Sequence, residues 1–401
     1  MVDVRVISNK ERVNSARVRP LSYKITPDCV GDTVTFSLSR PRNLSVEVNG
    51  DIFHNLHLFA NPIDKFRPSD KEIQRALKKK KGSNLIYFGP GVHNLPNDTL
   101  FVPSGTTVYI DGGARVYGNI FTEGAHDVNI FGRGEVHPDG RGAGVWVRRS
   151  KNVRIDGIVV SQLPIGQCDS VELTNVKSIS YYGWGDGMDV FSSSNVILDG
   201  VFCRNSDDCA AVYASTQGFK GGSNNVLVKN ATLWADVAHP INIGGHGDPN
   251  GMDTVQNVTF RNIDILDQAE KQIDYQGCLA INPGDNTLVR NITFENIRIE
   301  DFRNGQLVNF RISFNSKYCV STGRGIQNVL VKDVTYNGSG ENLSIIAGYD
   351  ENHKISGIRF VNLVVNGRKI TDDMPGKPKW YKTGDMAGIF VGEHVENLSF
   401  E

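Results

Sequence analysis

The phrases "NVILDGV" (195–201), "NVLVKNA" (225–231), "NVTFRNI" (257–263), "NITFENI" (291–297) and "NVLVKDV" (328–334) are copies of one repeat. Their starting positions are 30, 32, 34 and 37 residues apart. Each copy alternates apolar and polar residues, which is the period of a half-buried strand. Most copies then reach an Asn-apolar or Gly-apolar step, where the chain is expected to turn. The repeat therefore predicts a stack of similar strand-and-turn units.

Further copies extend this stack in both directions: "DVNIFGR" (127–133), "NVRIDGI" (152–158), "SVELTNV" (170–176), "GIRFVNL" (357–363) and "NLSFE" (397–401). No segment with a helical period lies between the copies, which excludes helical repeats, and the uneven spacing argues against four-stranded propeller blades. We therefore predict an all-β fold, a right-handed parallel β-helix whose coils run from about Leu100 to the C-terminus. The asparagines at the repeated turn are expected to bond to their equivalents in neighbouring coils.

A stack of coils exposes its apolar ends and needs caps. The segment "SDKEIQRALKKKK" (69–81) predicts one capping helix, because Ser69 and Glu72 form a capping-box pattern. Its lysine run is interpreted as a solvated helix end. The apolar stripe of this helix consists of Ile73, Ala76 and Leu77.

Two domains are expected. Residues 1–62 show strand alternation with an Asn49-Gly50 hairpin turn, and they predict a small N-terminal β-strand unit. Residues 63–401 are then the β-helix domain together with its N-terminal helical cap.

Composition narrows the classes of function. The 401-residue chain has a formal net charge of -1 and 39% hydrophobic residues, so we expect neither a nucleic-acid partner nor a membrane span. Six cysteines without a CxxC pair favour buried free thiols, although a Cys203–Cys209 bridge stays open. The start lacks the apolar region of a signal peptide, which predicts a cytoplasmic chain or a secreted or periplasmic one whose leader was removed. Nothing in the sequence indicates an oligomeric state.

Four aspartates stand in segments that are otherwise typical of strands: Asp186, Asp189, Asp207 and Asp208. The first and last are 22 residues apart with one repeat phrase between them, which places them on adjacent coils about 4.8 Å apart, the strand spacing. Carboxylates this close repel one another, so a pKa rises and a proton is shared. Such a cluster suits acid–base cleavage of a glycosidic bond. Adjacent strand residues normally face opposite ways, so both acids of the Asp207-Asp208 pair reach one site only where the strand bends.

Three short motifs carry a family resemblance: "WGDGMD" (184–189), "SDDCAAV" (206–212) and "DVAHPINIGGHG" (236–247). With them the chain resembles glycoside hydrolase family 28, the polygalacturonases, and the related dextranase and isopullulanase family, which share a pectin-lyase-like β-helix. The resemblance implies an inverting glycosidase in which Asp207 is the general acid. It also implies that Asp186 and Asp208 orient and deprotonate the attacking water, and that His239 bonds near the acid and tunes it.

One departure from the polygalacturonase pattern bears on the substrate. The family's Arg-Ile-Lys, which grips a uronate carboxylate, is matched here by a strand with Ala280 and Asn282, and Arg311 follows one coil later. Without a cationic fork a uronate is poorly bound, so a neutral or non-pectic glycan is favoured.

Further substrate contacts are expected around the acids. Aromatic side chains stack on sugar faces and also fill cores, and here Trp184 and Tyr213 are the candidates. Asp189 either bonds the backbone or lines a sugar subsite. His246 contacts substrate, lies in a loop, or replaces His239 in a rival alignment. The substrate-binding set is Trp184, Asp189, Tyr213, His246, Asn282 and Arg311.

The expected partner is a polysaccharide or oligosaccharide, and neither a metal nor an organic cofactor is expected, because carboxylates do the proton work. Two alternatives stay open. One is a polysaccharide lyase or uronate epimerase on the same fold, and the other is a non-catalytic carbohydrate-binding β-helix, since one fold hosts many chemistries.

Overall fold

The structure is a computed structural model that describes residues 1–10, 12–78, 82–339 and 341–401. It divides into two compact units, Met1–Lys65 and Phe66–Glu401, whereas the sequence suggested a boundary after residue 62. Among the described residues, none of the helices has the length and apolar character that crossing a bilayer requires.

The N-terminal unit consists of two small antiparallel sheets. The Asn49-Gly50 turn joins β5 to β6, and both turn residues have positive φ, as a tight hairpin requires, so the predicted hairpin is confirmed. The sheets contain β1 (Val2–Ile7), β4 (Thr33–Leu38) and β3 (Asp28–Val30), and β2 (Ala16–Arg19), β5 (Arg42–Val48) and β6 (Asp51–Ala60), with a short helix η1 (Leu21–Tyr23).

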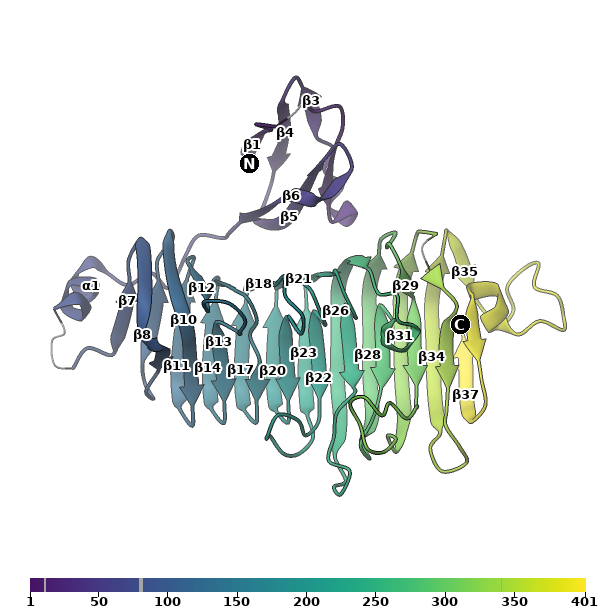
Figure 1. Cartoon of the computed structure of the whole chain (residues 1–401). Coiled ribbons are helices and arrows are strands. Elements are labelled where there is room, and N and C mark those ends of the chain that lie inside the picture. Colours follow the sequence, from purple (N-terminus) through teal and green to yellow (C-terminus); the bar gives the residue numbers. More distant parts are fainter. Residues whose placement is uncertain (11, 79–81, 340) are drawn as a thin grey trace. The chain divides into compact units, whose positions relative to one another are not determined.

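The second unit is a right-handed parallel β-helix, as predicted (Figure 1), and 29 of its described strands form one continuous sheet. Each coil contributes a strand to three faces. Face 1 contains β13 (Val145–Arg148), β16 (Ile165–Gly166), β19 (Met188–Phe191), β22 (Ala210–Tyr213), β25 (Ile241–Gly244), β27 (Leu279–Asn282), β30 (Val308–Arg311), β33 (Ser344–Ala347) and β36 (Ile389–Val391).

Face 2 holds the repeat phrases. It contains β7 (Leu85–Phe88), β9 (Thr107–Ile110), β11 (His126–Gly132), β14 (Lys151–Asp156), β17 (Asp169–Thr174), β20 (Ser194–Asp199), β23 (Asn224–Lys229) and β37 (Val395–Phe400). Four long strands bend from face 2 into face 3: β26 (Thr254–Gln268), β28 (Leu288–Ile299), β31 (Gly325–Tyr336) and β34 (Ile355–Val365).

Face 3 starts with the first parts of β8 (Gly91–Phe101) and β10 (Ala114–Glu123), whose second parts continue into face 1. Its remaining strands are β12 (Glu135–His137), β15 (Val159–Val160), β18 (Lys177–Ile179), β21 (Phe202–Asn205) and β24 (Thr232–Ala235). Short accessory elements are β29 (Gly305–Gln306), β32 (Glu341–Asn342), β35 (Arg368–Ile370), η2 (Ile273–Tyr275) and η3 (Thr383–Ala387).

The coils begin at β7, earlier than the predicted start near Leu100, because Gly89-Pro90 interrupts the repeat pattern there. The apolar positions of the repeat stack inside the helix in columns. One such column is fully buried and consists of Val196, Val226, Val258, Ile292 and Val329. Burial of these columns supplies the main stabilisation of the stack.

Both ends of the stack are covered. At the N-terminal end lies α1 (Asp70–Leu77), where Ser69 and Glu72 form the predicted capping box. Ile73 is buried, but Leu77 is exposed because the helix ends there, so the predicted stripe was too wide. Lys79–Lys81 of the predicted helix lie outside the described residues. At the other end β35 turns back antiparallel to β34.

All six cysteines are free thiols. Cys203 and Cys209, whose pairing the sequence left undecided, therefore do not form a disulfide bond.

Asparagines hold the corners of the repeat. The first Asn of each phrase has a left-handed backbone, as at Asn225 (φ 57°) and Asn291 (φ 57°), and a second left-handed residue ends most phrases, as at Asn262 (φ 57°). Asn tolerates this conformation better than other non-glycine residues. The predicted bonding between coils is confirmed: Asn225 Nδ2 donates to Asn195 Oδ1 at 2.7 Å, and Asn262 Nδ2 donates to Asn230 Oδ1 at 2.7 Å.

Replacing Asn262 with Ala is expected to lower the free energy of unfolding by about 1–3 kcal/mol, because a left-handed Ala costs more and hydrogen bonds to two coils are lost. Asn262→Gly keeps the left-handed backbone and should lose only about 1 kcal/mol. Urea denaturation followed by circular dichroism measures both values. Equal losses in the two variants would show that backbone conformation is not what Asn262 contributes.

Candidate active site

The pairing of β19 with β22 brings the acidic motifs together. Met188 pairs with Ala210, and the Gly187 N–H donates to the Asp208 carbonyl at 2.7 Å. The 22-residue spacing is therefore one coil, as the sequence predicted, and Asp186 lies in the coil next to Asp208.

Both members of the Asp207-Asp208 pair line the same pocket, because they precede the strand. β22 begins only at Ala210, and the backbone bends through residues 206–209. Two adjacent side chains can therefore project to one side while Cys209 is buried in the core. The side-chain amide of Asn205 braces this turn by donating to Ser180 Oγ at 2.9 Å and to the Asp186 carbonyl at 3.2 Å.

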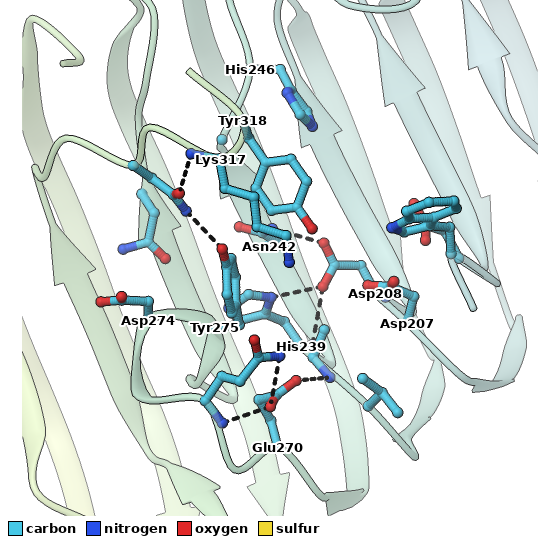
Figure 2. Close-up of a pocket in the computed structure, with 18 of the residues that line it drawn as sticks. Asp207, Asp208, His239, Asn242, His246, Glu270, Asp274, Tyr275, Lys317 and Tyr318 are labelled. Carbon is cyan, nitrogen blue, oxygen red and sulfur yellow. Dashed lines mark hydrogen bonds and ion pairs between the residues drawn. The ribbon is translucent and has the colours of Figure 1, made fainter. Parts of the chain in front are cut away.

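The pocket has a volume of about 590 Å³, within the usual range for small-molecule sites. It collects nearly all of the residues singled out in the sequence: Trp184, Asp186, Asp207, Asp208, Tyr213, His239, His246, Asn282 and Arg311. Figure 2 shows Asp207 and Asp208 in this pocket with His239 beside them.

Asp208 is held by four donors. Its Oδ1 accepts from the His239 N–H at 3.0 Å and lies 2.7 Å from His239 Nδ1. Its Oδ2 accepts from Tyr213 Oη at 2.6 Å and from Asn242 Nδ2 at 2.7 Å. Burial alone would raise the pKa of Asp208, but the charge on His239 and these hydrogen bonds outweigh it and lower the pKa to about 2. Asp208 is therefore ionised throughout the neutral range.

Asp207 has the opposite environment. It is mostly buried, and its carboxylate accepts a hydrogen bond from the adjacent Asp208 N–H at 3.0 Å. Burial, followed by the negative charges of Asp208 and Asp186, raises the pKa of Asp207 to about 8. Near neutral pH Asp207 consequently carries a proton.

Asp186 and Asp189 form a second acidic pair. Burial and then the charges of Asp189 and Asp208 raise the pKa of Asp186 well above its usual value. Burial also raises the pKa of Asp189 to about 8, and a side-chain hydrogen bond links it to Asp186. Asp189 does not line the pocket and is only 4% exposed. The structure therefore contradicts the expected contact between Asp189 and the substrate.

The two histidines differ in what they contact. His239 binds Asp208, the neighbour of the predicted acid, rather than Asp207 itself. His246 instead makes edge-on ring contacts with Tyr213 and Tyr318 at centroid distances of 5.0 and 6.1 Å. Of the two rival alignments, the geometry around the acids favours His239.

The remaining predicted contacts surround the acids. Trp184 is 71% exposed at the pocket rim, where it can stack on a sugar, whereas Tyr213 is buried and acts through its hydroxyl group. Asn282 Nδ2 donates to Asn309 Oδ1 at 3.1 Å, and Arg311 is paired with Asp274 at 2.7 Å.

Several residues of the pocket were not singled out from the sequence, among them Asn242, Glu270, Asp274, Tyr275, Lys317 and Tyr318. Only Asn242 could have been found, because the alternation "INIG" after His239 places it on the outer side of β25. The others come from loops of irregular length, whose path no periodicity fixes. In the part of the chain that the structure describes, no group of three or more His, Cys, Asp or Glu side chains is arranged to hold a metal ion.

The chain is similar in sequence to known proteins. A polygalacturonase from Juniperus ashei is 26% identical over 295 residues, which is 65% of this chain and 54% of that protein. The chain spans about half the length of the curated relatives it matches.

Two solved structures share the fold over 99% of this chain. Dex49A from Penicillium minioluteum aligns with a TM-score of 0.64, 14% identity and 81% of its own chain covered. The family 28 exopolygalacturonase of Yersinia enterocolitica aligns with a TM-score of 0.56, 12% identity and 96% of its own chain covered.

The sequence profile described as "Glycosyl hydrolases family 28" matches residues 143–375. The matched region contains all of the acids in the pocket and the coils that align them. Since it covers more than half of the chain, this protein belongs to glycosyl hydrolases family 28.

Proposed function

We propose that the chain is an inverting glycosidase that cleaves glycosidic bonds in a polysaccharide or oligosaccharide. One observation carries this proposal: Asp207 and Asp208 line one pocket with pKa values moved in opposite directions, to about 8 and about 2. A protonated carboxyl group beside a charged carboxylate is the arrangement that glycoside hydrolysis uses.

Asp207 donates its proton to the glycosidic oxygen as the bond between that oxygen and the anomeric carbon breaks. A water molecule held by Asp186 attacks the opposite face of the sugar. An ionised carboxylate has about four lone-pair sites, and all of those on Asp208 already accept hydrogen bonds. Asp186 therefore takes the proton of the water, which it does only in its ionised form, above its raised pKa. The charge of Asp208 stabilises the positive charge that develops on the sugar.

A neutral or non-pectic glycan is the favoured substrate. Ala280 is buried, and the side-chain amide of Asn282 donates a hydrogen bond to Asn309. Arg311 already forms an ion pair with Asp274. The pocket lining includes five acidic side chains, of which Asp207 is protonated near neutral pH, and, besides histidines, two cationic ones, Arg311 and Lys317. A polyuronate would bring further negative charge into this surrounding, which costs free energy.

Asp207→Asn removes the proton donor while keeping the size of the side chain. We expect turnover to fall by about 100- to 10,000-fold, the range that general acids contribute. Reducing ends released from dextran, polygalacturonate and xylogalacturonan measure it.

The matched control is Asp127→Asn, on the outer side of β11, which recreates the Asn–Asn contact of other coils and should keep full activity. Full activity in Asp207→Asn would remove that residue from the acid role. Unsaturated ends that absorb in the ultraviolet would indicate a lyase, and binding without cleavage would indicate a carbohydrate-binding protein.

The pH dependence of kcat/KM follows from Asp207. This carboxyl group must be protonated to act, so activity is lost as the pH rises through about 8. Asp186 must be ionised to act, so activity is also lost as the pH falls through its raised pKa. A pH–rate profile on the substrate that is cleaved fastest tests this. An alkaline limb near pH 4–5, as an unperturbed carboxyl group would give, would contradict the assignment.

Dextran is expected to give a higher kcat/KM than polygalacturonate, because the uronate positions are neutral and the pocket is acidic. The comparison is made at equal ionic strength, since screening weakens charge repulsion. A preference for polygalacturonate would show that Lys317 and Arg311 suffice to bind a uronate.

A further inference from the structure

Two loops leave face 1 at opposite edges near its C-terminal half. The first loop, residues 269–278, leads into β27 on the same edge as the acids. The second loop, residues 312–324, follows β30 and leaves from the other edge. An open cleft along face 1 requires these two loops to remain apart.

The two loops instead meet above the face. Asn315 Nδ2 donates to Tyr275 Oη at 3.2 Å, and the rings of Tyr275 and Tyr318 contact edge to face at 5.8 Å. Lys317 Nζ lies 5.1 Å from the Tyr275 ring centroid and 4.8 Å from that of Tyr318. Figure 2 shows Tyr275 approaching Lys317 and Tyr318 across the strands.

The contacts among Tyr275, Lys317 and Tyr318 form a bridge between the two loops, and this bridge is also attached to face 1 beneath it. Arg311, at the end of β30, is paired with Asp274 of the first loop at 2.7 Å. The second loop is anchored through Cys319 Sγ, which donates to the Gly245 carbonyl at 3.1 Å. Face 1 and the two loops together close the C-terminal side of the pocket.

The N-terminal side has no such bridge. There the loop with Tyr181 and Trp184 faces residues 214–222 from the other edge, and no hydrogen bond or ring contact joins these two segments in the described part of the chain. Tyr181 and Trp184 are 86% and 71% exposed. The strands that carry the two loops lie two and three coils from the β22 coil. The second loop folds back over the β25 coil, where Tyr318 contacts His246, so the bridge stands close to the acids.

We propose that the site takes the end of a glycan chain, which enters past Trp184 and stops against Tyr275, Lys317 and Tyr318. The distance between the bridge and Asp207 then sets the length of the product, so short products of one size are released from chain ends. This inference rests on the proposed glycosidase function and adds its mode of attack.

The test follows viscosity and reducing ends together during early hydrolysis of whichever polymer is cleaved fastest: dextran, polygalacturonate or xylogalacturonan. We expect reducing ends to accumulate while the viscosity stays nearly constant, with one short product from the first time points. A steep fall in viscosity with mixed product lengths would overturn the proposal. Lack of cleavage of all three polymers would instead overturn the proposed function on which it rests.

The double variant Tyr275→Ala/Tyr318→Ala removes the rings of the bridge. It should release a broader range of product lengths, with a severalfold larger viscosity loss per bond cleaved. Tyr349→Ala, at a half-exposed tyrosine outside the pocket, is the matched control and should leave the product size unchanged. An unchanged product size in a folded double variant would show that the bridge does not limit chain entry.

Discussion

The register between neighbouring coils is the constraint on which the site depends. Parallel pairing places equivalent residues of successive coils about one strand spacing apart, so Asp186 and Asp208 become neighbours although 22 residues separate them. The register is fixed from inside by columns of Val and Ile and from outside by asparagines at left-handed corners. A shift of one residue would turn the buried column outward and would separate the acids as well.

Burial and charge then give chemically identical carboxyl groups different protonation states. Asp208 has its donors built into the next coil, through His239 and Asn242, so it stays ionised in a buried position. Asp207 lacks such donors and lies beside that fixed negative charge, so it keeps its proton. The difference arises from the partners that each side chain meets at the same turn, which is how a single fold keeps one carboxyl group protonated beside another that is ionised.

Much of this could be predicted from the sequence, because the repeat is periodic. The phrases between residues 195 and 334 specify strand, corner and interior column, and the spacing of Asp186 and Asp208 specifies one coil. The placement of Asp189 was missed, since alternation alone cannot tell a pocket wall from the layer beneath it. Glu270, Tyr275 and Lys317 were missed because they lie in loops whose conformation depends on contacts between coils that are far apart in sequence.

The bridge between residues 269–278 and 312–324 has a consequence for how such a protein can diversify. The coils that carry the acids contain neither loop, and the strands of face 1 keep their pairing whatever length the intervening segments have. On the proposal that the bridge stops the glycan, loop exchange would convert a blind-ended site into a through-going groove while the paired strands keep the acids in place. The chemistry and the choice between trimming and internal scission would then be inherited separately.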